Sequence, residues 1–118
     1  MIEILVAKVF STRGLAHLQH WNTPSYAQHI ALGSFYSDII EDIDKIVEVY
    51  QGLFGKIAVP ELPAVIMSKN ITKTLEDDIK WISDNRSKIS KGISAIENLI
   101  DGLSETYLQT LYKLKNLS

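Results

Sequence analysis

Residues 93–117, ISAIENLIDGLSETYLQTLYKLKNL, carry the clearest structural pattern in the chain. Apolar side chains, with one tyrosine and one threonine, recur there at intervals of three and four residues: Ile93, Ile96, Ile100, Leu103, Tyr107, Thr110, Leu114 and Leu117. This period predicts an amphipathic helix from about residue 90 to 117, and its alternation favours near-antiparallel packing in a bundle. Leu99, Leu108 and Leu111 widen the apolar stripe, so we expect this helix to meet two neighbours.

The same periodicity predicts three more helices, at about residues 2–21, 24–51 and 71–89. The expected core stripe of the second of these is Tyr36, Ile40, Ile43, Val47 and Tyr50. Residues 53–69 contain two prolines and many apolar side chains. We expect them to form a crossing loop that packs on the bundle or on a neighbouring subunit. The sequence therefore predicts an all-α, antiparallel four-helix bundle, with the crossing loop between its second and third helices.

Composition narrows the class of protein. A chain of 118 residues with 46% apolar side chains is expected to form one domain, over residues 1–118. It has no cysteine, which excludes disulfides and thiolate metal sites. Its net charge is −2 and its basic residues are dispersed, so we do not expect nucleic-acid binding. No apolar run approaches the ~18 residues of a membrane span, and we expect no membrane insertion.

Histidines and carboxylates gather in the first half of the chain. His17 and His20 are three residues apart, His29 follows nine residues later, and Asp44 and Glu48 lie 15 and 19 residues after His29. If Ile40 marks the centre of the second helix's inner face, His29 falls about 20° from it, Asp44 about 40° and Glu48 about 80°. We therefore expect His20, His29 and Asp44 to point into the core, with Glu48 at its border.

Buried ionisable groups need partners, and three kinds of partner are possible for these side chains. A metal ion could be held by imidazole and carboxylate ligands, a set that suits iron, zinc or manganese. Arg13 could instead form an ion pair with Asp44 or Glu48. Finally, the histidines and carboxylates could form structural hydrogen bonds.

Two short segments resemble the ferroxidase signature of Dps-type mini-ferritins. They are His-Trp-Asn at residues 20–22 and Tyr-Ala-Gln-His at residues 26–29, followed by Asp44 and Glu48. The spacing from the second histidine to both carboxylates is that of the Dps signature. The two histidines, however, are three residues closer together than in Dps. The resemblance implies a ferritin-like bundle.

In that family the histidines of one subunit face the carboxylates of its neighbour. The resemblance therefore implies an Fe(II) site made of His20, His29, Asp44 and Glu48 across a dimer interface, with His17 as an alternative ligand or in the surrounding shell. Oxidation or sequestration of the iron would follow. Trp21, which otherwise suits core or interface packing, would then lie beside the metal.

A resemblance that covers nearly the whole chain is to short proteins encoded by bacteriophages and prophages, which are themselves similar to ferritin-like bundles. The matching positions are His17, His20, Ser25, Tyr26, Ala27, His29, Ala31, Leu32, Tyr50, Gln51 and Gly52. This resemblance implies a location in the bacterial cytoplasm or on a virion. It carries no activity.

Two hypotheses for function follow. The first is a mini-ferritin-like iron protein, for which ferroxidase activity stays open. The second is a non-catalytic helical scaffold or interaction protein, whose Arg13 would pair with Asp44 or Glu48, or whose histidines would bond to backbone groups. We expect a homo-oligomer, at least a dimer, under both. Asp78 is expected to be a solvated charge at the flank of the third helix, with a metal ligand as the alternative.

Overall fold

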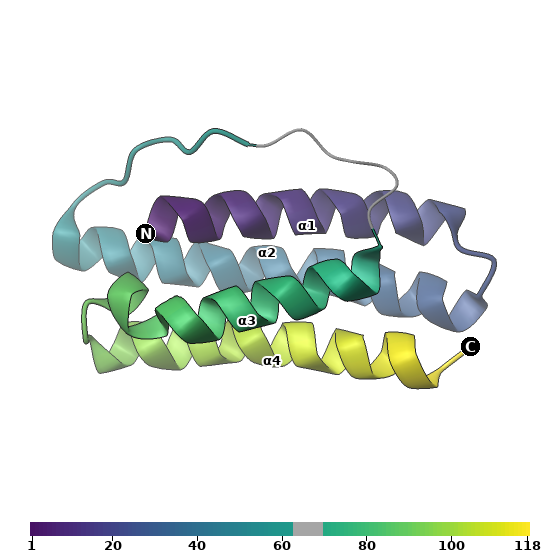
Figure 1. Ribbon diagram of the computed structural model, residues 1–118. Coiled ribbons are helices and arrows are strands. Elements are labelled where there is room, and N and C mark those ends of the chain that lie inside the picture. Colours follow the sequence, from purple (N-terminus) through teal and green to yellow (C-terminus); the bar gives the residue numbers. More distant parts are fainter. Residues whose placement is uncertain (63–69) are drawn as a thin grey trace.

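In a computed structural model of the protein, four helices account for most of the chain (Figure 1). They are α1 (Ile2–Asn22), α2 (Tyr26–Phe54), α3 (Ile71–Ser90) and α4 (Ser94–Asn116). The structure describes residues 1–62 and 70–118, and these contain no strand. The prediction of four helices is confirmed, each beginning and ending within a few residues of its expected bounds. None of the four is long and apolar enough to cross a membrane.

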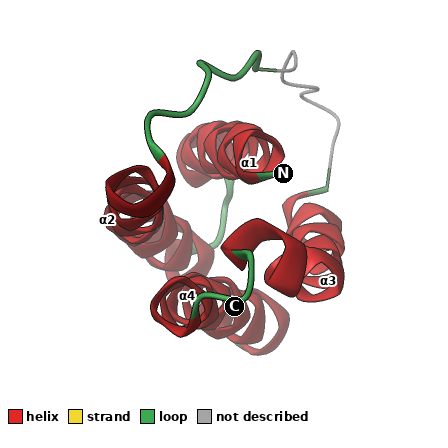
Figure 2. Cartoon of the chain, turned by 90° about the vertical axis from the view of Figure 1, so that its left-hand side faces the viewer, coloured by secondary structure: helices red, strands yellow, loops and turns green. Residues whose placement is uncertain are grey.

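The helices form a four-cornered bundle, in which α1 packs on α2 and α3, and α4 closes the opposite corner (Figure 2). Helices α1 and α4 run in one direction along the bundle, and α2 and α3 run in the opposite direction (Figure 1). Each helix is therefore antiparallel to both of its neighbours. Bundles with one long crossover are a known class. The narrower expectation of a ferritin-like bundle stays a prediction.

Part of the expected crossing loop can be described. Ile57 packs against the core, whereas Val59 is almost fully exposed and Leu62 is also exposed. The remaining apolar residues of that prediction, Val65, Ile66 and Met67, lie outside the described residues. Among the described loop residues, Ile57 is therefore the one that packs on the hydrophobic core, while Pro60 is half-buried.

Helix α4 buries six of the eight side chains in the predicted stripe, whereas Ile93 is half-buried and Leu117 is exposed. Fully or nearly buried are Ile96, Ile100, Leu103, Tyr107, Thr110 and Leu114. Leu99 and Leu111 are half-buried at the edges of the stripe, and Leu108 is exposed. The wide stripe reflects the contacts of α4 with both α2 and α3.

The core face of α2 differs from the prediction. Its buried residues are Ala31, Leu32, Phe35, Ile39, Ile43 and Ile46. The face is therefore centred on Ile39 and not on Ile40, which rotates every other residue by about 100°. Of the expected stripe, Ile43 is buried as predicted, whereas the others lie half-buried beside this face: Tyr36, Ile40, Val47 and Tyr50. Because α2 packs between α1 and α4, its apolar arc is broad, and the pattern alone left two possible centres.

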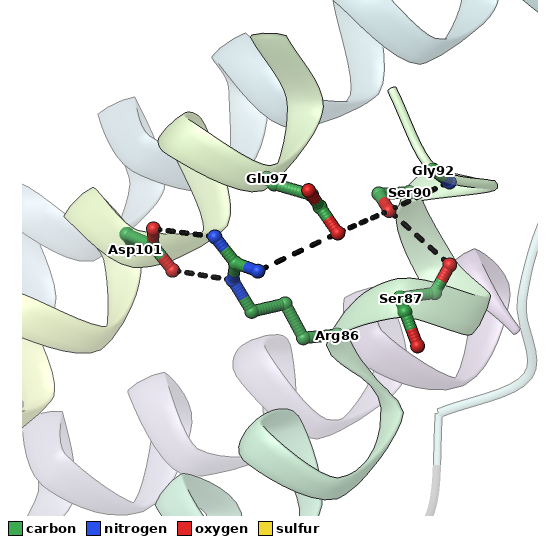
Figure 3. Close-up of polar contacts among 6 residues, drawn as sticks. All are labelled: Arg86, Ser87, Ser90, Gly92, Glu97 and Asp101. Carbon is green, nitrogen blue, oxygen red and sulfur yellow. Dashed lines mark hydrogen bonds and ion pairs between the residues drawn. The ribbon is translucent and has the colours of Figure 1, made fainter. Parts of the chain in front are cut away.

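One end of the bundle is fixed by a polar network between α3 and α4 (Figure 3). The Arg86 guanidinium donates to both carboxylate oxygens of Asp101, at 2.7 and 2.8 Å, and lies 3.4 Å from Glu97. Ser90 donates to Glu97 and accepts from the backbone of Gly92 in the turn. These contacts tie the turn to both helices, and the hydrogen bonds from Arg86 lower the pKa of Asp101.

Asp78 is buried, contrary to the expectation of a solvated charge. Its side chain is 6% exposed and accepts hydrogen bonds from Thr12 on α1 and from Tyr107 on α4, the latter at 2.8 Å. Burial, together with the charge of Asp78, raises the pKa of Tyr107 well above its usual value. Asp78 thus links three helices through hydroxyl donors that look like ordinary stripe residues in the sequence.

Candidate functional site

The three histidines meet where α1 and α2 are joined. Ser25 caps the start of α2, because its hydroxyl accepts a hydrogen bond from the backbone N–H of Gln28 at 3.2 Å. Thr23 contacts both residues of this cap. Its hydroxyl accepts a hydrogen bond from the backbone N–H of Ser25 and donates one to the side-chain oxygen of Gln28. The short turn therefore has its own hydrogen bonds, and it places the last turn of α1 opposite the first turn of α2.

His20 and His29 face each other across this junction. Nδ1 of His20 lies 2.6 Å from the backbone oxygen of His29, and Nδ1 of His29 lies 2.7 Å from the backbone oxygen of His20. The two rings stack with centroids 3.7 Å apart and an angle of 17° between their planes. Because a carbonyl oxygen can only accept, both Nδ1 atoms carry hydrogen. In the neutral rings, both Nε2 atoms then hold a lone pair.

The carbonyl of His20 explains why this pair forms. In a continuing helix it would accept from the residue four positions later, but that residue is Pro24, which has no N–H. His29 supplies the missing donor from its ring. We call this pair of hydrogen bonds and stacked rings the histidine latch, formed by His20 and His29.

A glycine makes room for the latch. A β-carbon added at Gly33 would lie 3.0 Å from Cε1 and 3.2 Å from Nδ1 of the His20 ring. Contacts this short are closer than ordinary van der Waals packing. Gly33 therefore allows the ring of His20 to lie against the backbone of α2. The sequence signal was a glycine inside a helical pattern, which often marks close approach.

The latch is the centre of a continuous row of six rings, which we call the aromatic ladder. Successive ring centroids are 4.7, 4.0, 5.3, 3.7 and 6.3 Å apart along the row Trp21, His17, Tyr36, His20, His29 and Tyr26. His17 is nearly parallel to Tyr36, at 11°. The three histidines thus pack against one another and against aromatic rings contributed by both helices.

Arg13 does not pair with the predicted carboxylates. Its Nε donates to the backbone oxygen of Tyr36 at 3.0 Å, and its guanidinium lies over the Tyr36 ring. Asp44 and Glu48 are both exposed. The expectation that Asp44 points into the core and Glu48 borders it was wrong, because with Ile39 at the centre they lie about 140° and 180° away.

The structure brings His17, His20 and His29 together but leaves Asp44 and Glu48 on the outer side of α2. In residues 1–62 and 70–118, no three His, Asp or Glu side chains are grouped so that they could hold a metal ion. Of the features expected for the scaffold hypothesis, histidines bonded to backbone groups are present. A metal site shared between two copies of the chain stays a prediction.

Comparison with known proteins identifies relatives of this chain. Residues 20–114 match the model of a family described as "Family of unknown function (DUF5856)". The chain is also 31% identical, over 98 residues, to an "Uncharacterized 14.6 kDa protein in mobD-ri intergenic region" of Enterobacteria phage T4. That alignment covers 83% of this chain and 75% of the phage protein. No solved structure matches the chain. The matched region includes the latch, α2, α3 and nearly all of α4, and the chain belongs to the DUF5856 family.

Proposed function

We propose that this protein is a non-catalytic helical interaction protein of the kind that phages encode, acting in the host cytoplasm or on a virion. The observation that carries the proposal is the histidine latch. Both Nδ1 atoms are used in holding α1 to α2, and one of them replaces the donor that Pro24 cannot supply. Residues that resemble a catalytic or metal-binding motif therefore have a structural role that accounts for their type and spacing.

The surroundings of the latch support the same proposal. Asp44 and Glu48 are exposed on α2, and Arg13 binds the backbone of Tyr36. No carboxylate among the described residues bonds to any of the three histidines. The predicted site of imidazole and carboxylate ligands would need such groups close together. The similarity to a phage protein supports a role in a phage, although fold and relationship alone do not identify a binding partner.

The test is to measure the metal content and the mass in solution of untagged protein, before and after anaerobic addition of Fe(II). The proposal predicts that the protein retains no stoichiometric iron and that its mass in solution does not change. About one or two irons held per site would overturn it, provided that they are lost in His29→Ala while the helical circular dichroism is kept. Asp38→Asn is the matched control, because Asp38 is another exposed α2 carboxylate outside the predicted ligand set.

A second candidate is a mini-ferritin-like protein with a ferritin-like fold that binds Fe(II), and one observation favours it. Metal-binding histidines usually donate their other ring N–H to a backbone carbonyl or a carboxylate, and the latch gives both rings such a partner. Within residues 1–62 and 70–118, no group of three His, Asp or Glu side chains completes a site around these two nitrogens in one chain. His20 and His29 would therefore bind iron with Asp44 and Glu48 of a second copy, and His17 would lie beside them.

The two candidates differ in which substitutions remove iron. If iron binds across a dimer, Asp44→Asn and Glu48→Gln should each weaken binding, and a mixture of His29→Ala with Asp44→Asn chains should recover some sites. Iron binding that is insensitive to both carboxylates would contradict this second candidate. The readout is bound Fe(II) measured by equilibrium dialysis, so that it does not depend on any oxidase activity.

A further inference from the structure

Three large side chains are exposed around the junction of α1 and α2. Trp21 is 69% exposed, Tyr26 is 77% exposed and Ile30 is 49% exposed. Trp21 lies in the last turn of α1, while Tyr26 and Ile30 lie one turn apart at the start of α2. Of the two kinds of packing expected for Trp21, in the core or at an interface, packing in the core is therefore not found within this chain. We call this group the end surface.

The end surface lies in an uncharged part of the sequence. Between Arg13 and Asp38, residues 14–37 contain no Asp, Glu, Lys or Arg. Exposed surface without charge and rich in aromatic residues has the composition of an interface core. The exposed face of α3 differs, since it carries the ion pairs Lys73–Asp77 and Lys80–Asp84.

The aromatic ladder holds the end surface in place. Trp21 packs on His17 at 4.7 Å, and Tyr26 lies over His29 at 6.3 Å with only 25° between the ring planes. Each exposed ring thus rests on a ring that is itself packed between the helices. Rigid aromatic groups lose little conformational entropy when a partner covers them, so such a surface is prepared for binding.

We propose that the end surface is a self-association interface, occupied by a second copy of this chain related by two-fold symmetry. The proposal deepens the interaction role proposed above and rests on it. Its basis is electrostatic. Two copies can join through residues 14–37 without bringing like charges of that segment together, and a partner recognised by charge would find no Asp, Glu, Lys or Arg within it.

The rest of α2 agrees with this arrangement. The exposed carboxylates of α2 all lie closer to its C-terminal end than the end surface does: Asp38, Glu41, Asp44 and Glu48. A symmetric copy centred on Tyr26 and Ile30 would send the two acidic segments in opposite directions. A parallel copy in register would place them side by side and would be opposed by their repulsion.

The area available suggests a reversible dimer. Two aromatic rings bury about 150–250 Å² each when fully covered, whereas a standard interface buries about 800 Å² per partner. At their present exposure Trp21 and Tyr26 supply roughly a third of that area, and Ile30 with the turn residues adds to it. We therefore expect association that depends on protein concentration.

The test is sedimentation equilibrium of the full chain, with a metal chelator present, over a concentration range of about a hundredfold. The proposal predicts a monomer–dimer equilibrium that Trp21→Ser and Tyr26→Ser each weaken by at least about tenfold. Tyr112→Ser is the matched control, because Tyr112 is 62% exposed on α4 and lies outside the end surface. All three side chains are largely exposed, so the variants should keep the helical circular dichroism of the original protein.

Symmetry provides a second test. Tyr26→Asp and Tyr26→Lys should each be monomeric alone, since a two-fold axis near Tyr26 brings like charges together. An equimolar mixture of the two variants should form dimers again. A mixture that stays monomeric would overturn the symmetric arrangement.

Other outcomes separate this proposal from the one it rests on. A metal-free protein that is monomeric at every concentration, or whose dimer responds equally to Tyr112→Ser, overturns the end-surface proposal and leaves the structural role of the latch intact. A dimer that forms only after Fe(II) is added overturns both. A monomer that captures a different protein through Trp21 also overturns self-association.

Discussion

His20 and His29 each donate a hydrogen bond from ring Nδ1 to the backbone carbonyl of the other, at 2.6 and 2.7 Å. The exchange is reciprocal and joins the last turn of α1 to the first turn of α2. It also brings the two imidazole rings into contact at a centroid distance of 3.7 Å. A proline that removes a donor from α1 is thus compensated by a side chain from the next helix.

Loss of the latch should destabilise the bundle. His29→Ala removes the donor to His20 and the stacked ring, so we expect a loss of about 1–3 kcal/mol in the free energy of unfolding. His29→Asn should lose less, because the amide nitrogen of Asn can replace Nδ1 as the donor. Urea denaturation followed by circular dichroism measures both. Equal losses for Ala and Asn would show that the hydrogen bond to His20 contributes nothing.

The effect of Gly33→Ala on stability should change sign when the His20 ring is removed. Alanine is favoured over glycine inside a helix by about 1 kcal/mol, but here its β-carbon would meet the His20 ring at 3.0 Å. We expect the substitution to destabilise the original protein and to stabilise a His20→Ala background. Gly102→Ala on α4, where a β-carbon meets nothing, should stabilise both backgrounds. If Gly33→Ala stabilised the original protein too, the ring of His20 would not lie where the structure places it.

The buried phenol of Tyr107 predicts a loss of stability in alkali. Its pKa is raised well above 10.0 in the folded protein, so above about pH 10 the unfolded chain loses this proton while the folded chain keeps it. The free energy of unfolding should then fall by about 1.4 kcal/mol per pH unit from this group.

Tyr107→Phe isolates that contribution. It removes a hydrogen bond to Asp78 and should lower stability by about 1–3 kcal/mol at neutral pH, yet the difference from the original protein should shrink as pH rises past 10. Denaturation at a series of pH values measures this, with Tyr112→Phe as the exposed control. A difference that stays constant up to the pH of unfolding would count against a buried, protonated Tyr107.

The ion pair at the α3–α4 end predicts an effect in acid. Arg86 lowers the pKa of Asp101 in the folded protein. The stability that this ion pair provides is therefore present above the ordinary Asp pKa of 3.8, and it is lost as the pH falls through the lowered pKa of Asp101. Arg86→Ala should move the midpoint of acid unfolding to higher pH. Lys80→Ala, which breaks a more exposed pair with Asp84, should move it less. Equal shifts for both variants would mean that the network in Figure 3 adds nothing beyond a surface pair.

The sequence predicts α4 well because its stripe has one centre and few apolar residues outside it. Helix α2 is harder, since Ile39, Ile40, Ile43, Ile46 and Val47 fit either of two faces about 100° apart. Only packing against both α1 and α4 decides between them. That single rotation moved the predicted carboxylates from the core to the surface.

The candidate site was predictable in part. The grouping of His20 and His29 followed from their positions at the ends of two adjoining helices. Their partners did not, because a backbone carbonyl left free by Pro24 has no side-chain signature. The prediction that Asp78 is solvated was wrong for a similar reason. Its donors, Thr12 and Tyr107, come from distant helices and look like core residues.

The central claim is that His20 and His29 are structural, and the protonation of their ring nitrogens tests it most directly. Long-range ¹H–¹⁵N NMR correlations distinguish Nδ1–H from Nε2–H imidazoles, and they can be recorded on metal-free protein at neutral pH before and after Zn²⁺ is added as a diamagnetic probe. We predict hydrogen on Nδ1 of both rings and no change on adding the metal. Hydrogen on Nε2 of either ring, or Nε2 signals of both rings that shift at one equivalent of metal, would contradict the account.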